Sequence, residues 1–206
     1  MRPIALLLAL TLLAACGSED EDTPAAASVT AQAPAPIKCE IDRNSIAGIP
    51  LGTTIEQVRQ QFPKALIKSL QDNEGIAFTS IQLTPDIQIF AYTDSSQATA
   101  ADNSPITYLD TASAACKTEQ GVHPFMEVAK AEQIYGAVQQ IVMSEAEARQ
   151  TAEFDQQPPE LSFRIDDSGA FDLTDNNLPK ITTDYQEGAK IHSIAVMNLP
   201  AEEVAQ

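Results

Sequence analysis

The densest group of chemically capable side chains is an acidic loop near the C-terminus. It reads Asp-Asp-Ser-Gly-Ala-Phe-Asp-Leu-Thr-Asp, and Gly169 favours a turn within it. Asp166, Asp172 and Asp175 supply the carboxylate oxygens that Ca²⁺ prefers. The order is not that of an EF-hand, because Asn177 stands where that loop has its bidentate Glu. Two interpretations stay open: a weak calcium site or a solvated acidic loop.

Two histidines, His123 and His192, are the other candidates for catalysis or metal binding. They fall in different predicted elements, a turn and the last strand, so only the fold could bring them together. The chain has no Gly-x-Ser-x-Gly elbow, phosphate-binding loop, dinucleotide fingerprint or His-Glu-x-x-His motif. We therefore expect a non-enzymatic protein without a cofactor. A periplasmic hydrolase that uses a pair of carboxylates is kept as an alternative.

A short apolar segment at the N-terminus ends at Cys16. Arg2 precedes the run Ile4–Ala15, which is shorter than the ~20 residues of a membrane-spanning helix. The two alanines before Cys16 resemble the lipobox of bacterial lipoproteins. The resemblance implies that residues 1–15 are a signal peptide and that Cys16 carries a diacylglycerol thioether and an amine-linked acyl chain such as palmitate. An ordinary secretory signal with an unmodified Cys16 is the alternative.

The residues after Cys16 bear on localisation. Gly17 stands where an Asp would resemble the inner-membrane retention signal of diderm lipoproteins, so a Gram-negative source implies an outer-membrane anchor. Residues 16–36 are rich in Pro, Ala and acids without apolar periodicity, which predicts a disordered tether. Residues 37–206 are long enough for one folded domain with its own core.

Cys39 and Cys116 remain once Cys16 is assigned to the lipid. An even pair of cysteines in an oxidising compartment predicts a disulfide bond. Two unpaired, buried thiols are the alternative. The chain has no Cys-x-x-Cys, so a redox motif is not predicted.

The chain is strongly acidic, with 12 Lys and Arg against 29 Asp and Glu and a net charge of −17. Residues 37–206 retain 11 basic and 25 acidic residues, a net charge of −14. This balance argues against binding nucleic acid or anionic lipid through basic patches. It favours a solvated acidic surface or a cationic protein partner.

Two stretches of sequence, Gly48–Pro63 and Gly121–Gly136, match at an offset of 73 positions. In each stretch a glycine turn leads into a predicted helix with apolar residues at helical spacing. The matched apolar positions are Ile55 with Val128, Val58 with Ala131 and Phe62 with Tyr135.

The helix ends also have sequence signals. Thr53 and Thr54 are candidate N-caps, each with a Glu or Gln three residues later, and Pro63 ends the first helix. Pro124 suits the first turn of the second helix, and Gly136 suits its C-terminal cap.

Strand-like runs follow each helix. They are Ile76–Leu83, Ile87–Tyr92, Ile106–Leu109, Val138–Met143, Leu161–Ile165 and Ile191–Met197. Ser144–Phe154 is predicted to be a helix, with Ser144 and Glu147 as a capping box. Thr93–Pro105 and Asp166–Lys180 are predicted loops. We expect an α+β fold: antiparallel strands with helices on one face, in two pseudo-repeats, residues 45–111 and 117–198.

The pattern Gly-x-x-x-Gly-x-Thr-x-x-x-Val, at Gly48–Val58, resembles that of envelope lipoproteins of unknown function. More distantly it resembles SmpA/BamE-like lipoproteins and the tandem-repeat fold of β-lactamase inhibitory proteins. The second copy departs from it, since Phe125 replaces the second Gly. The resemblance implies a scaffold that binds other proteins or is structurally passive.

We therefore expect a lipid-anchored module with a protein partner in the envelope. The surfaces to test are the two Gly-turn/helix elements and any exposed strand edge. An inhibitor of a basic cell-wall enzyme such as lysozyme is a second hypothesis, suggested by the acidic charge and the inhibitor-like repeat.

Overall fold

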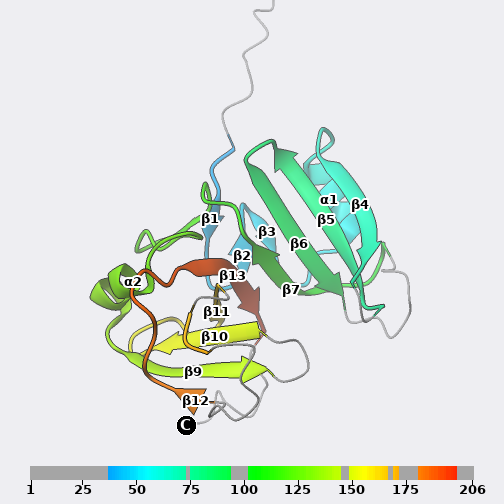
Figure 1. The fold of residues 1–206 in the computed structure, drawn as a ribbon. Helices are drawn as coiled ribbons and strands as arrows, with labels where there is room; N and C mark the ends of the chain where they lie inside the picture. The colour runs from blue at the N-terminus through cyan, green and yellow to red at the C-terminus, as the bar shows by residue number, and fades with distance from the viewer. Residues whose placement is uncertain are drawn as a thin grey trace, which may run out of the picture. The chain divides into compact units, whose positions relative to one another are not determined.

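The computed structural model describes residues 37–72, 75–93, 102–144, 149–166, 169–171 and 181–198, all within the compact unit Pro36–Gln206. These residues form a mainly β structure with two short helices (Figure 1). The helices are α1 (Ile55–Gln61) and α2 (Val128–Tyr135). The strands are β1 (Glu40–Ile41), β2 (Ser45–Ile46), β3 (Ile49–Pro50), β4 (Leu66–Gln71), β5 (Ala77–Thr84), β6 (Ile87–Thr93), β7 (Ile106–Thr111), β8 (Lys117–Thr118), β9 (Val138–Ser144), β10 (Arg149–Phe154), β11 (Leu161–Ile165), β12 (Ile181–Thr182) and β13 (Ile191–Met197).

In the described residues, nine strands form one long antiparallel sheet in the order β12-β9-β10-β11-β13-β7-β6-β5-β4. Its centre is the pair β7 and β13, where Asp110 lies opposite Ala195. β4 and β12 are its two edges (Figure 1). A smaller sheet has the order β3-β2-β1-β8, and β1 runs parallel to β8. Parallel pairing of segments so far apart in sequence needs a long connection, which here contains α1 and β4–β7.

One face of the long sheet, which we call the inner face, carries the core. Residues alternate across a strand, so Ile87, Ile89 and Ala91 of β6 are buried while the residues between them are not. α1 contributes Ile55 and Val58 to the same buried cluster. The cluster also contains Ile81, Leu109, Val128, Ala131, Ile141, Phe163, Ile165, Ile191, Ile194 and Val196. The opposite side is the outer face.

The six predicted strands are confirmed, but the predicted helix Ser144–Phe154 is wrong. Arg149–Phe154 is β10, which pairs with both β9 and β11. Its buried residues alternate as Gln150, Ala152 and Phe154. Tertiary burial of one face has overridden the helical preference of Ala, Glu and Arg. With β4 and β12 also strands, the fold is mainly β, and the expected layer of helices on one face is not supported.

The helix ends follow the sequence only in part. Thr54 is the N-cap of α1 and forms the capping box with Gln57; Thr53 is not the cap. α1 ends at Gln61, before Pro63. α2 begins at Val128, so the prediction that Pro124 lies in its first turn is wrong. Gly136 ends α2 with a φ of 82°, as the sequence predicted.

The turns before the two helices share positive φ at two matched positions. Gly48 and Gly121 both have positive φ, at 75° and 89°. Gly52 has φ 83°, and Phe125, which is 73 positions later, has φ 70°. A side chain in this left-handed region costs roughly 1–2 kcal/mol, so Phe125 is held there by its surroundings. The backbone N–H of Phe125 donates to the Ile191 carbonyl at 2.7 Å.

Candidate functional site

A disulfide joins Cys39, just before β1, to Cys116, just before β8, with 4.4 Å between their Cα atoms. The predicted pairing is therefore confirmed. Both cysteines are buried, and the covalent loop between them contains all of β1–β7. The bond fastens the chain where it enters the domain.

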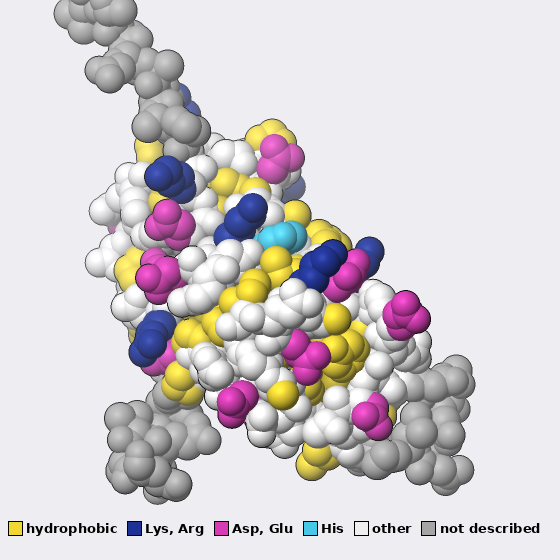
Figure 2. All heavy atoms as spheres, turned by 90° about the vertical axis from the view of Figure 1, so that its left-hand side faces the viewer, with side chains coloured by type: hydrophobic (Ala, Val, Ile, Leu, Met, Phe, Trp, Pro, Cys, Tyr) yellow, Lys and Arg dark blue, Asp and Glu magenta, His cyan; other side chains and the backbone are white. Residues whose placement is uncertain are grey.

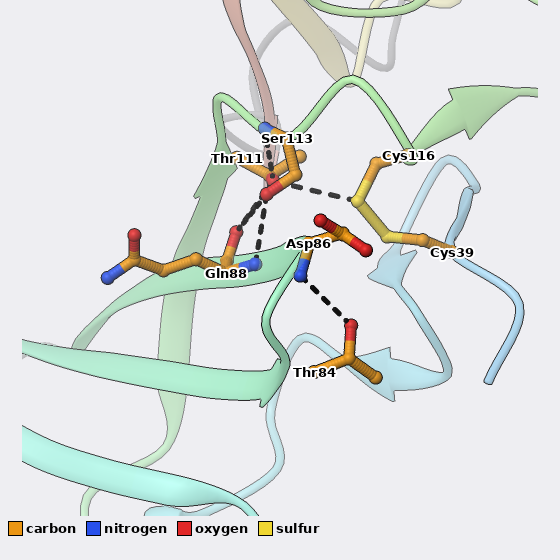
Figure 3. Close-up of a disulfide and its surroundings, with 7 residues drawn as sticks. All are labelled: Cys39, Thr84, Asp86, Gln88, Thr111, Ser113 and Cys116. Atoms are coloured by element: carbon orange, nitrogen blue, oxygen red, sulfur yellow. Dashed lines mark hydrogen bonds between the residues drawn. A yellow bond between two sulfur atoms is a disulfide. The ribbon is translucent and has the colours of Figure 1, made fainter.

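The surroundings of the disulfide are ordered by side-chain hydrogen bonds. The Thr111 hydroxyl donates to the Gln88 carbonyl at 2.7 Å and lies 3.6 Å from Cys116 Sγ. The Gln88 N–H donates to Ser113 Oγ at 2.9 Å (Figure 3). A groove of about 610 Å³ opens beside the bond, and Lys38, Lys117 and three acidic residues contribute to its lining. Its mixed charges select neither anions nor cations.

Several predicted site residues lie outside the described residues. They are Cys16, Asp172 and Asp175, together with the signal peptide and the tether. In the described part of the chain, no group of three His, Cys, Asp or Glu side chains could hold a metal ion. In the same residues, no helix is both long and apolar enough to span a membrane. The calcium and lipid predictions stay predictions.

The start of the acidic loop is anchored in the core. The Asp166 N–H donates to the Lys190 carbonyl at 2.9 Å. The Gln150 amide accepts from Ala170 N at 2.7 Å and donates to the Phe171 carbonyl at 3.2 Å. Phe171 is itself buried. The described start of this loop is therefore held by contacts that the sequence did not reveal.

The two histidines have separate surroundings. His123 Nδ1 lies 2.8 Å from the Pro124 carbonyl oxygen and donates to it. His192 is on β13, where its charge acts on the Asp110 carboxylate. Neither contact assembles a catalytic pair.

Aromatic side chains form a row across the outer face. We define this outer row as Leu70, Phe78, Tyr92, Tyr108 and Met197, one residue from each of five neighbouring strands. The rings of Phe78 and Tyr92 are stacked at 5.5 Å, and those of Tyr92 and Tyr108 meet edge to face at 5.4 Å. Except for Leu70, which is exposed, these side chains are half-buried. Such rings offer a large, stiff and partly polar contact surface.

Next to the outer row is a polar cluster at the centre of the sheet. Burial raises the pKa of the Asp110 carboxyl above its ordinary value, while a hydrogen bond from Ser193 and the charges of Arg164, His192 and Arg149 oppose the shift. Within the described residues, Asp110 Oδ1 and Arg164 Nε are buried without a hydrogen-bond partner. Buried polar groups without hydrogen-bond partners, and carboxyl groups with a shifted pKa, are common at binding sites. No local sequence pattern marked them.

Tyr185 is a second residue with a shifted pKa, and its role is structural. Burial, followed by the hydrogen bond to Glu132, raises the pKa of Tyr185 to about 12. Its hydroxyl donates to Glu132 Oε2 at 2.5 Å, and Glu132 Oε1 accepts from Val138 N at 2.8 Å. Glu132 thus ties α2 to the start of β9 and to the loop that contains Tyr185.

The region around α2 also exposes apolar side chains. Phe125 is 56% exposed and Ile134 is 36% exposed. Figure 2 views this side and shows apolar side chains between acidic and basic ones. Phe125 combines a strained backbone conformation with an exposed ring, and the two costs together mark it as a secondary candidate for contact with a partner.

The chain has a likeness among solved structures. No protein-family model matches the chain. No curated protein matches it either. It is similar to the crystal structure of the uncharacterized protein yfeY from Escherichia coli, with a TM-score of 0.49 and 9% sequence identity, over 78% of this chain and 99% of that one.

Proposed function

We propose that this protein is a lipid-anchored, non-enzymatic module that binds another protein of the bacterial envelope through the outer row of its long sheet. The outer row carries the proposal. A surface with aromatic side chains from three neighbouring strands is costly to leave in water, and large rings dominate the energetics of protein interfaces. The neighbouring Asp110 and Arg164 would give such an interface polar specificity.

Two further features support the anchoring part of the proposal. Cys16 follows a signal-like apolar segment, and the disulfide fastens the chain close to where the tether would begin. Two or more acyl chains anchor a protein stably, because each buried CH₂ contributes ~0.8 kcal/mol. In a Gram-negative source, the outer membrane is the proposed location.

We also infer that the domain consists of two pseudo-repeats. α1 and α2 begin 73 positions apart, at Ile55 and Val128, after turns that share positive φ at two matched positions. β4–β7 follow α1, and β9, β10, β11 and β13 follow α2; each set is contiguous in the long sheet. The pair β7–β13 joins the two sets.

Photocrosslinking in intact cells tests the binding proposal. A photoreactive phenylalanine analogue replaces Tyr92 in the outer row, and in a matched variant it replaces Glu153, which is exposed on β10. We expect a discrete adduct with one protein from position 92 and none from position 153. Equal adducts from both positions, or none from either, would contradict the proposal.

Mass spectrometry of the mature N-terminus tests the anchor. We expect an N-terminal Cys16 with diacylglycerol and acyl modification in the membrane fraction. Cys16→Ser should leave an unmodified protein outside that fraction. An unmodified Cys16 in the wild-type protein would refute the anchor and leave the binding proposal to its own test.

The two alternative functions, an enzyme inhibitor and a hydrolase, each have a specific test. The acidic charge of the domain favours an inhibitor of a basic enzyme such as lysozyme, because opposite charge speeds association. Unchanged lysozyme activity with excess protein at low salt would exclude it. The raised pKa of Asp110 is the observation that favours a hydrolase, since it suits a general acid. Turnover of murein that is lost in Asp110→Asn would support that alternative.

A further inference from the structure

The edge strand β4 is exposed in a way that the other long strands are not. Five of its six residues are exposed, whereas β6 and β9 alternate between buried and exposed positions. Leu66 is 61% exposed and Leu70 is 41% exposed. A six-residue edge strand that leaves two leucines in water is unusual for a monomer, because such edges tend to pair with other strands.

The backbone of β4 offers a template for one more strand. In the described residues it forms a six-residue antiparallel ladder with β5 and pairs with no other strand. Its second edge therefore presents N–H and C=O groups outward, and an extended segment could continue the sheet there. Among the described residues, the strand at the opposite edge, β12, has two residues, against six in β4.

The outward side chains of β4 specify what such a segment should carry. Leu66, Lys68 and Leu70 lie on the outer face, because they pair with Gln82, Ser80 and Phe78. Side chains directly opposite across a new ladder would contact these three. An acidic residue suits Lys68, and apolar residues suit the leucines. The apolar residue opposite Leu70 would also extend the outer row by one strand.

A second copy of the chain fits this edge poorly. The register that pairs Leu66 with Leu70 of a copy also places Lys68 against the same lysine of that copy, and like charges directly opposite are destabilising. The net charge of −14 over residues 37–206 adds repulsion between copies.

We propose that the outer edge of β4 binds an extended segment of the partner protein, added as a tenth strand, whose alternate side chains are apolar, acidic and apolar. This inference rests on the proposed function and names the chemistry that the partner must present. The pattern reads the same in both directions, so it holds for a parallel or an antiparallel addition.

Peptide titration of the ¹⁵N-labelled full chain in detergent, followed by amide chemical shifts, tests the proposal. The probes are the peptides Thr-Leu-Thr-Glu-Thr-Leu-Thr and Thr-Leu-Thr-Lys-Thr-Leu-Thr at millimolar concentration. We expect the largest shifts at residues 66–70 and tighter binding of the Glu peptide by roughly two- to fivefold, the effect of one exposed ion pair. Lys68→Glu should reverse this preference.

The control variant is Lys117→Glu on β8, which changes the net charge equally at another exposed lysine. It should keep the wild-type preference. Unchanged preference in Lys68→Glu, shifts centred away from β4, or no shifts at all would overturn the proposal. Shifts at β4 that depend on the concentration of the chain alone would show a second copy to be the occupant, and would also overturn it.

Failure of this inference can be told apart from failure of the proposed function. An adduct from position 92 without a peptide response at β4 would remove the added strand but keep the binding module. A Lys68-dependent peptide response, without an adduct, would support this edge and count against the outer row as the docking surface.

Discussion

The two halves of the long sheet place their aromatic residues on opposite faces. In the second half, Tyr135, Phe154 and Phe163 form a cluster on the inner face, with Phe163 fully buried. In the first half, the core is aliphatic, and the rings of Phe78 and Tyr92 lie on the outer face. The rings of the second half therefore pack in the core, while those of the first half lie half-buried on the outer face, where the proposed partner would contact them.

The two halves also differ in their edge strands and in the N-caps of their helices. The first half ends in the exposed six-residue β4, and the second half ends in the short β12. α1 has a complete capping box, whereas α2 has Glu127 at its N-cap without a side-chain hydrogen bond. The buried hydroxyl of Tyr135 donates to Thr118 Oγ1 at 2.9 Å. α1 thus depends more on its local sequence and α2 more on tertiary contacts.

Aromatic truncation should give the largest contrast between the halves. Phe163→Ala removes a fully buried ring and should cost about 3–5 kcal/mol in the free energy of unfolding. Phe90→Ala, on the outer face, should cost about 1–2 kcal/mol, because its ring is half-buried and contacts Phe78 edge to face. Urea denaturation measures both. Equal costs would mean that the outer rings are structural.

The disulfide should contribute the next largest effect. Cys39→Ala with Cys116→Ala should lower the free energy of unfolding by about 2–5 kcal/mol, since the bond closes a loop with a sequence separation of 77. Reductant should destabilise the wild-type protein to the same extent. Reductant should leave the free energy of unfolding of the double variant unchanged. A further loss of stability in that variant would point to a reductant effect unrelated to the disulfide.

The matched turns should respond oppositely to substitution. Gly52→Ala should cost about 1–2 kcal/mol through the left-handed backbone alone, because no atom lies within 4 Å of the added Cβ. Phe125→Gly should relieve the same strain and stabilise the domain by up to about 1 kcal/mol. Thermal unfolding compares the two. A loss of stability in Phe125→Gly would show that the ring packs more than its exposure indicates.

Substitution of the N-cap residue should cost α1 more stability than α2, and this difference is smaller than the preceding ones. Thr54→Ala breaks the capping box of α1 and should cost about 1 kcal/mol. Glu127→Ala at the N-cap of α2 should change stability by less than about 0.5 kcal/mol, because no side-chain cap is lost. Urea midpoints at constant slope measure the difference. A larger cost at Glu127 would contradict the contrast between local and tertiary support.

The smallest expected effect is at Asp110, where Ser193 and the cationic neighbours oppose desolvation. The pKa is raised in the fold, so the contribution of Asp110 is fully present below its ordinary value of 3.8 and is lost as pH rises through the raised pKa. Asp110→Asn should therefore be more stable than wild type at pH 7, and this gain should vanish at low pH. Asp155→Asn, which removes an equal charge on the surface, is the control. A gain that persists below pH 3.8 would refute the assignment.

Short-range patterns were sufficient for much of the fold. Alternation in Ile87–Tyr92 and Leu161–Ile165 predicted strands, and Thr54 with Gln57 predicted the start of α1. The sequence did not predict β10 as a strand, because its buried face includes Gln150, whose polar side chain hid the alternation. Its amide bonds with the backbone of Ala170 and Phe171, which are about 20 residues away, so no local window contains this contact.

The candidate site was not predictable in the same way. β4 does not alternate apolar and polar side chains, since Leu66 adjoins Ile67 and Lys68 adjoins Ser69, so the sequence predicted neither this strand nor its place at an edge. Tyr92 and Tyr108 are brought together by strand register, and Asp110 acquires its raised pKa from burial and from neighbours on other strands. These properties depend on pairing between segments that are distant in the chain.

The sequence by itself determined the acidic charge and predicted the Cys39–Cys116 pair and most strands, because composition, the number of cysteines and alternation over a few residues are enough for these. The anchor at Cys16 stays a prediction from the sequence. Only the tertiary structure decided which face each aromatic residue occupies and which strand forms the exposed edge. The physical reason is that shifting a strand by one residue exchanges its two faces, and the register that prevents this is set by the whole sheet.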